Sequence, residues 1–370
     1  MSSASPFHDP ERVALLTTRL HEVAGTIRRP VTFMEVCGTH THAIAAAGLR
    51  RLLPPNVRLV AGPGCPVCVT PVDYLDHALA LAARDDVTIC TFGDLVRVPA
   101  SRRDSLERAS ARGARIKIVY SPRDALPLAE QEPQRTVVFL AVGFETTMPT
   151  VAAALVEAER RGLANFRVLC GAKVIEPPLR ALLRDPELRL DGFLLPGHVS
   201  VVLGADFYRF LTTDCGVAAA IAGFTPVDLQ GALLELLLQV AGGRLRVANL
   251  YPRAVTAAGN VTAQALLQRC FVPCDTRWRG LGVIPGSGLA LRPEFAHRDA
   301  ATIPVTLPEP LEPKGCRCGE VLRGTIAPPA CPLFGRGCTP DHPIGACMVS
   351  GEGSCAAWFR HERHHAEAST

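Results

Sequence analysis

The sequence predicts an α/β protein with two parallel-sheet βαβ lobes that face a cleft, followed by a C-terminal cysteine-rich region. Short β-rich runs alternate with helical stretches over the first two-thirds of the chain. Most of these runs are almost continuously apolar, which is typical of strands buried on both faces of a parallel sheet. Six of the 14 cysteines fall between residues 316 and 355.

The alternation of strands and helices indicates βαβ units, because parallel strands need a crossover connection that is usually helical. The expected strands are, in order, 31–36, 57–62, 87–92, 115–120, 136–142, 166–170 and 191–195. Helical patterns between them lie at 41–53, 72–85 and 150–162.

The order of these elements divides the chain into three parts. A first α/β domain is expected over residues 1–133 and a second over 134–245, since both segments have a similar order of elements. Beyond residue 245 the alternation fades, and residues 301–316 are rich in proline, as in an extended linker. Residues 246–370 are expected to form the C-terminal domain.

Bulk composition narrows the classes of function. The chain is 48% apolar and 20% charged, which is ordinary for a globular protein. Few aromatic residues, a net charge of only +4 and no long basic run argue against a nucleic-acid partner. Charged residues interrupt the N-terminal apolar stretch, and no segment approaches the roughly 18 apolar residues of a membrane span. We therefore expect a cytoplasmic protein without a membrane partner, whose cysteines are thiols rather than a disulfide framework.

Polar or sulfur-containing groups directly follow four of the expected strands. They occupy residues 37–42 (CGTHTH), 63–68 (PGCPVC), 143–147 (GFETT) and 196–200 (PGHVS). Ligands of α/β proteins bind at the carboxyl ends of the strands, so these loops are expected to line one cleft.

Cys37 and His40 are three residues apart in the first of these loops. A thiolate and an imidazole at this spacing suit one soft or borderline metal ion. The imidazole would alternatively lower the pKa of the thiol and create a nucleophile. A buried structural cysteine followed by a helix-capping Thr39 is equally consistent with the pattern.

Cys65 and Cys68 form a C-x-x-C pair in the second loop, where Gly64 permits a tight turn. This spacing suits a dithiol/disulfide couple or two ligands of one metal ion. Two unrelated packed cysteines are the alternative.

The remaining two loops carry weaker signals. Glu145, Thr146 and Thr147 would add a carboxylate and hydroxyls to the cleft, or the threonines would cap the next helix. His198 would be a ligand or a proton carrier, although a lone histidine is more often structural.

The C-terminal cysteines form the strongest signal, with the pattern C-x-C-x12-C-x6-C-x8-C-x7-C. A short segment rich in proline and glycine has a poor apolar core and needs a covalent or metal link to be stable. Zinc held by four thiolates and a [4Fe–4S] cluster held by four thiolates are both open. The paired C-x2-C knuckles common in zinc sites are absent, which favours iron–sulfur.

Together these motifs resemble those of the HypD family of [NiFe]-hydrogenase maturation proteins. The resemblance runs in order from residue 34 to residue 355 and covers nearly the whole chain. One position departs from the pattern, because Thr225 in GFTPVDL replaces an expected acidic residue. The matching stretches are MEVCGTHTH, GPGCPVC, GFETT, PGHVS, WRGLGVIPGSGL and the tail CRCGEVLRG…CPLFG…CTP…PIGACMVSGEGSC.

The resemblance implies a function. HypD-like proteins form a scaffold with the small protein HypC, on which the Fe(CN)2(CO) group of the hydrogenase is assembled, and they receive cyanide ligands from HypE. The hydrogenase large subunit is served indirectly. Carried over, Cys37 would be the principal thiolate for a transient mononuclear Fe(II) that carries CN and CO ligands, with His40 beside it. Cys65 and Cys68 would be a nearby redox-active or iron-supporting pair, and an electron-relay dithiol that faces Cys37 is favoured over a closed metal site.

The resemblance also implies a [4Fe–4S] cluster in the C-terminal domain. Cys316, Cys331, Cys338 and Cys355 would be its ligands, and Cys318 and Cys347 would form an extra thiol pair. Two other functions compete with the scaffold. One is a stand-alone iron–sulfur thiol/disulfide oxidoreductase, and the other is a zinc-stapled enzyme with Cys37 as its nucleophile.

Overall fold

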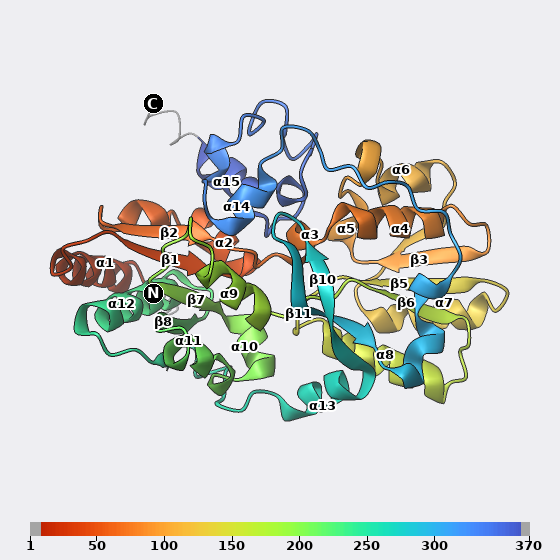
Figure 1. Ribbon diagram of the computed structural model, residues 1–370, viewed down its shortest axis with the longest axis horizontal. Helices are drawn as coiled ribbons and strands as arrows, with labels where there is room; N and C mark the ends of the chain where they lie inside the picture. Colours follow the sequence, from red (N-terminus) through yellow and green to blue (C-terminus); the bar gives the residue numbers. More distant parts are fainter. Residues whose placement is uncertain (1–8, 364–370) are drawn as a thin grey trace, which may run out of the picture.

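A computed structural model describes residues 9–363 and contains two parallel sheets and one antiparallel hairpin. The two sheets form lobes at opposite ends of an elongated molecule, and the hairpin lies between them (Figure 1). The cysteine-rich end of the chain sits above the junction of the lobes. The α/β class with parallel sheets and a cysteine-rich C-terminal region is confirmed.

The first sheet has the strand order β2-β1-β7-β8-β9, and every neighbouring pair is parallel. Its central strands β7 and β8 are buried along their whole length, as expected for strands covered on both faces. The strands are β1 (Val31–Glu35), β2 (Val57–Ala61), β7 (Gly192–Pro196), β8 (Ala218–Ala222) and β9 (Val247–Asn249).

The second sheet has the order β4-β3-β5-β6 and is also parallel. Strand β3 is buried at all five positions, whereas β4 is a short edge strand with exposed residues. The strands are β3 (Val87–Thr91), β4 (Ile116–Ile118), β5 (Thr136–Ala141) and β6 (Phe166–Cys170).

The division of the chain into consecutive domains at residues 133 and 134 does not match the sheets. Strand β7 pairs with β1, so the first lobe is built from two chain segments, about 31–61 and 192–249. The second lobe is the insertion between them, which includes β3 to β6. Strands β1 and β7 are both apolar strands of the parallel type, and nothing in the local sequence of such a strand specifies its partner. The order of elements along the chain was therefore a misleading guide to the domain division.

Helices cover both faces of the two sheets (Figure 1). Helix α1 packs on α12 at the outer face of the first lobe, and the apolar run 233–240 lies within α12. None of the helices in the described part of the chain is long and apolar enough to span a membrane. Those before the hairpin are α1 (Pro10–Gly25), α2 (Gly38–Ala46), α3 (Pro66–Val69), α4 (Val72–Ala82), α5 (Gly93–Val96), α6 (Leu106–Ala111), α7 (Ala125–Gln131), α8 (Met148–Arg160), α9 (Glu176–Leu183), α10 (Gly197–Leu203), α11 (Arg209–Thr213), α12 (Pro226–Gly242) and α13 (Val261–Cys270).

The expected C-terminal domain 246–370 is also divided differently. Strand β9 completes the first sheet, and the hairpin of β10 (Phe271–Trp278) and β11 (Gly282–Leu291) packs against α9 and β6. Only the end of the chain, with α14 (Cys318–Arg323) and α15 (Ser354–His361), forms the cysteine-rich region. The domain limits at residues 1 and 370 lie outside the described residues.

Thr225, the departure from the family pattern, has a structural role. Its side chain accepts a hydrogen bond from the backbone N–H of Asp228, and the Asp228 carboxylate accepts one from the Thr225 N–H. This is a capping box at the start of α12.

Candidate functional site

Residues from all four strand-end loops line one cavity of about 200 Å³. Because β1, β2 and β7 are parallel neighbours, their carboxyl ends meet at one edge of the first sheet. The second lobe contributes the loop after β5, and the cysteine-rich region contributes one carboxylate. The lining includes Cys37, Gly64, Thr147, His198 and Glu352.

Cys37 lies at the N-terminus of α2, directly after β1. Its side chain is almost fully buried, and burial raises the pKa of the thiol to about 12. The backbone N–H groups of His40 and Thr39 oppose this shift, whereas the nearby carboxyl of Glu352 adds to it. The thiol therefore keeps its proton at neutral pH.

Two carboxyl groups beside Cys37 were missed by the sequence analysis. Glu35 accepts hydrogen bonds from the Thr41 hydroxyl at 2.6 Å and from the Cys37 N–H at 3.3 Å, and burial raises its pKa to about 8. Glu352 accepts a hydrogen bond from the Thr39 hydroxyl at 2.6 Å. Both acids lie inside the quoted motifs MEVCGTHTH and SGEGSC, so position within a motif was the available signal.

The imidazole of His40 is placed away from the cavity. Its Nε2 lies 3.0 Å from the backbone oxygen of Gly223 and 3.3 Å from that of Ala222, at the end of β8. Burial lowers its pKa to about 4, so the ring is neutral. His198, rather than His40, lines the cavity, where its ring stacks on Phe224 with 4.1 Å between centroids.

The C-x-x-C loop packs directly behind Cys37. The Gly64 carbonyl accepts a hydrogen bond from the Gly38 N–H at 3.2 Å, and a Cβ at Gly64 would lie 2.2 Å from the backbone nitrogen of Cys37. Cys65 and Cys68 form a disulfide, and both residues are buried. The cavity is lined by the neighbouring Gly64 rather than by these two sulfur atoms.

The same loop also contacts the cysteine-rich region. Helix α3, which contains Cys68, packs against the turn Ala346–Met348, which contains Cys347. Gly353 lies against the backbone of Cys347, while its neighbour Glu352 reaches the cavity. The C-x-x-C pair therefore lies between the cavity and the C-terminal thiols.

In the GFETT loop, Glu145 is a buried carboxyl. Its Oε1 accepts a hydrogen bond from the Ile175 N–H at 2.9 Å, and its Oε2 has no hydrogen-bond partner within residues 9–363. Burial raises its pKa to about 7. Thr147 precedes α8 without a side-chain capping bond, and it lines the cavity together with Thr146.

All six C-terminal cysteines surround one small pocket, whose other walls include Leu333, Phe334 and Met348. The sulfur atoms of Cys318 and Cys347 are 2.8 Å apart, which brings together the two thiols expected to be an extra pair. The sulfur of Cys338 accepts a hydrogen bond from the Ile344 N–H at 3.3 Å. The expected ligands on this pocket are Cys316, Cys331, Cys338 and Cys355.

The donor set of this pocket fits a cluster held by thiolates. Four cysteines remain around it after Cys318 and Cys347 are paired, and four thiolates are the usual ligands of a [4Fe–4S] cluster. Within residues 9–363, no three histidine, cysteine, aspartate or glutamate side chains already converge on a position for a single metal ion.

The cysteines outside these sites fit structural roles. Cys90 is fully buried in β3, as expected for a core residue. Cys270 is buried and contacts the Ala152 carbonyl, whereas Cys274 lies half-buried on β10.

The fold and the site define a two-lobed α/β protein with a buried thiol at a sheet edge and a cysteine-lined pocket beside it. A family model described as "HypD: Hydrogenase formation hypA family" matches residues 11–362. The chain therefore belongs to the HypD family.

Relatives support the same assignment over almost their full lengths. The chain is 46% identical to hydrogenase maturation factor HypD of Azotobacter vinelandii, with 98% of this chain and 97% of the relative covered. It is 45% identical to hydrogenase maturation factor HypD of Escherichia coli K12, with both chains covered completely. It is 48% identical to the protein of that name from Rhizobium leguminosarum bv. viciae, with 90% and 89% covered.

Proposed function

We propose that this chain acts in [NiFe]-hydrogenase maturation, in the cytoplasm, as the scaffold and redox factor on which the Fe(CN)2(CO) group is assembled. The observation that carries the proposal is the placement of the C-x-x-C pair. The loop that holds the pair packs against the backbone of Cys37 through Gly64, and helix α3, which contains Cys68, packs against the turn of Cys347. The proposed iron-binding thiol of Cys37 and the C-terminal thiols are thus connected through a dithiol/disulfide couple.

Cys37 is the proposed ligand of the Fe(II) substrate. Replacement of its proton by iron removes the cost of a buried anion, which is the cause of its raised pKa. A soft thiolate suits iron that carries CN and CO ligands. The cavity of about 200 Å³ has room for a compact group of this kind.

The proposed protein partners are those that the family resemblance implies. A HypC-like small protein would supply a second thiol to the iron at the cavity mouth, and a HypE-like protein would donate cyanide. Glu352, His198 and Thr147 line the same cavity and would hold or move protons at the iron ligands. His40, which is neutral and bonded to β8, would position the N-terminus of α2 rather than bind iron.

Cys65 and Cys68 would supply electrons in pairs. Reduction of their disulfide by two electrons and two protons gives the dithiol, and its reoxidation returns two electrons for reductive cleavage of the bond between cyanide and its donor sulfur. Cys318 and Cys347 would pass electrons to this pair. When bound by Cys316, Cys331, Cys338 and Cys355, a [4Fe–4S] cluster would supply single electrons at low potential.

The experiment is delivery of cyanide to iron by the anaerobically purified complex with HypC-like and HypE-like partners. Infrared bands of iron-bound CN report the result. We expect the Cys65→Ala and Cys68→Ala variants to lose these bands, while the matched Cys274→Ala variant retains them. Unchanged delivery in the first two variants would refute the redox part of the proposal.

A stand-alone thiol/disulfide oxidoreductase is less well supported. Cys68 is fully buried and Cys65 nearly so, so a protein disulfide has no direct access to them. That function predicts turnover of a disulfide substrate without bound mononuclear iron.

A further inference from the structure

A basic segment of the second lobe is not used by the proposed function. Residues 97–117 contain seven cationic side chains and two carboxylates, so their net charge exceeds the +4 of the whole chain. All seven cationic residues are exposed. We call their surface the basic face; it comprises Arg97, Arg102, Arg103, Arg108, Arg112, Arg115 and Lys117.

Arg112 forms an ion pair with Asp104, but most of the other charges have no acidic partner among the described residues. Among the described residues, the guanidinium groups of Arg102, Arg103 and Arg115 form no hydrogen bond or ion pair. Arg97 and Arg108 donate only to backbone oxygens, at 2.9 and 2.7 Å. The basic face therefore keeps a positive field that is available to an anionic partner.

The basic face borders a groove of about 300 Å³ that reaches the cysteine-rich region. The second lobe lines the groove with Arg97, Arg103 and Arg108 and with the carboxylate of Glu107. The cysteine-rich region lines it with Asp341 and Ile344, among others. Ile344 donates its N–H to the sulfur of Cys338, a proposed cluster ligand. Only Ile344 would separate a molecule bound in this groove from the sulfur of Cys338 in the cysteine pocket.

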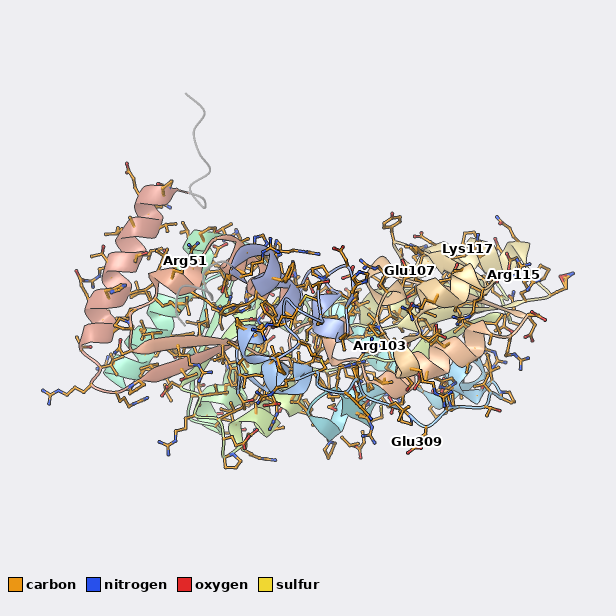
Figure 2. The ribbon with its side chains drawn as sticks, turned by 90° about the horizontal axis from the view of Figure 1, so that it is seen from above. Arg51, Arg103, Glu107, Arg115, Lys117 and Glu309 are labelled. Carbon is orange, nitrogen blue, oxygen red and sulfur yellow. A yellow bond between two sulfur atoms is a disulfide. The ribbon has the colours of Figure 1, made fainter. Side chains whose placement is uncertain are left out.

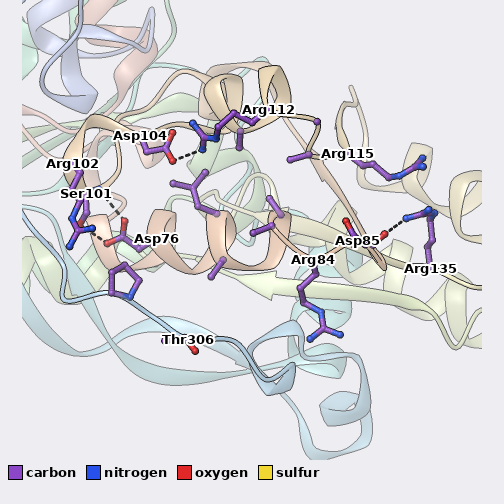
Figure 3. Close-up of a pocket in the computed structure, with 18 residues that line it drawn as sticks. Asp76, Arg84, Asp85, Ser101, Arg102, Asp104, Arg112, Arg115, Arg135 and Thr306 are labelled. Atoms are coloured by element: carbon purple, nitrogen blue, oxygen red, sulfur yellow. Dashed lines mark hydrogen bonds and ion pairs between the residues drawn. The ribbon is translucent and has the colours of Figure 1, made fainter.

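The basic face continues beyond the groove. A cavity of about 790 Å³ opens between α4 and α6 and contains Arg102, Arg112 and Arg115 (Figure 3). Figure 2 shows Arg103, Arg115 and Lys117 along this half of the molecule, with Glu107 among them. A face that spans two hollows is larger than a small anion requires, so a protein surface is the better fit.

Exposed apolar groups adjoin these charges. Ile118 is 56% exposed and Tyr120 is 94% exposed, at and just after the edge strand β4. Tyrosine and arginine are enriched in protein–protein interfaces. This composition also favours a protein partner over an inorganic anion.

We propose that the basic face docks a small acidic protein that carries single electrons. This proposal rests on the proposed function, because it uses the cysteine pocket as an electron acceptor. In each encounter the carrier is oxidised by one electron and a cluster held by the pocket is reduced by one. Transient redox complexes have small interfaces and depend on complementary charge for rapid association, which a field of exposed arginines provides.

The first test measures binding by isothermal titration, with an acidic plant-type ferredoxin as the probe and the anaerobically purified protein. We expect binding to weaken about tenfold between low and high salt. The double variant Arg103→Glu/Arg108→Glu should bind at least about tenfold more weakly. The control Arg28→Glu/Arg244→Glu makes the same charge change at exposed positions of the first lobe and should stay within about twofold of the parent.

The second test compares the rates of reduction by the ferredoxin and by dithionite. The charge-reversed variant should be slow with ferredoxin and unchanged with dithionite. Equal ferredoxin binding by the variant and its control would overturn the proposal, as would binding of a single-stranded RNA in place of ferredoxin. A protein that dithionite does not bleach would refute the cluster, while the titration would still decide whether the face binds an acidic protein.

Discussion

The sheet-edge cavity and the C-terminal pocket present thiols in opposite ways. In the cavity, Cys37 contributes the only sulfur atom among the lining residues that the structure describes, and secondary structure positions it between β1 and α2. In the pocket, six thiols face one another, and turns and short helices hold them. The cavity has a buried thiol among carboxyl groups, whereas the pocket has sulfur atoms as close as 2.8 Å.

The difference fits the division of labour proposed above. A single thiol on a rigid strand–helix junction suits selective binding of one cargo ion, because its geometry does not depend on that ion. A ring of thiols in a segment with little regular structure would depend on a bound group for stability. The following variants test whether the two regions are distinct in this way, beginning with the largest expected effect.

Cys37→Ala should abolish assembly without affecting the C-terminal pocket. We expect hydrogenase activity in a strain that lacks its own maturation factor to fall about 100-fold or more, because the iron loses its thiolate. The purified variant should keep its acid-labile sulfide. The control is Cys90→Ala in the core of β3, which should retain activity. Normal activity with Cys37→Ala would remove the cavity from the mechanism.

Cys338→Ser should remove a ligand from the C-terminal pocket and thereby also destabilise the fold. Loss of a metal-site ligand is among the strongly destabilising substitutions, and we expect a loss of about 3 kcal/mol in free energy of unfolding together with the sulfide. The matched variant is Cys274→Ser, at a half-buried cysteine outside the pocket. If both variants kept full sulfide, the assignment of Cys338 would be wrong.

Gly64→Ala should disrupt the contact between the C-x-x-C loop and Cys37. The new Cβ would lie 2.2 Å from the Cys37 nitrogen and 2.3 Å from the Val36 carbonyl carbon, and backbone atoms cannot easily yield. We expect a loss of about 1–3 kcal/mol in urea unfolding and a slower formation of iron-bound CN. Gly25→Ala, where a Cβ meets nothing within 4 Å, should be neutral or slightly stabilising.

Glu145→Gln should change how stability depends on pH. The folded-state pKa of about 7 lies above the ordinary value of 4.5, so the folded protein keeps a proton that the unfolded chain releases between these values. Stability of the parent therefore falls as pH rises from 4.5 to 7, by about 1–3 kcal/mol.

The isosteric glutamine keeps the bond from Ile175 and cannot ionise. Urea unfolding of both proteins across this range should show a shallower fall for Glu145→Gln. Parallel curves would mean that Glu145 does not titrate in this window.

Local patterns predicted the strands well but not their partners. Runs such as 31–36 and 136–142 are strands because continuous apolar sequences suit positions covered on both faces. The pairing of β1 with β7 joins residues about 160 positions apart, and no local signal encodes it. The β10–β11 hairpin was missed because its glycines and Pro273 obscure the strand pattern.

The sequence likewise predicted only part of the candidate site. Cysteines could be named because their chemistry is unusual at any position, and the loops that hold Cys37 and Gly64 do meet. Glu35 could not be distinguished from other acids, since its importance arises from complete burial beside Cys37. The direction of the His40 ring likewise depends on β8, about 180 residues away.

The most direct test of the account is a metal analysis of the anaerobically purified protein. Iron, acid-labile sulfide and zinc should be measured together for the parent and for Cys37→Ala. We expect about four sulfides and more than about four irons per chain in the parent, with only the excess iron lost in the variant. Stoichiometric zinc without sulfide would contradict it and would favour a zinc-stapled enzyme with Cys37 as its nucleophile.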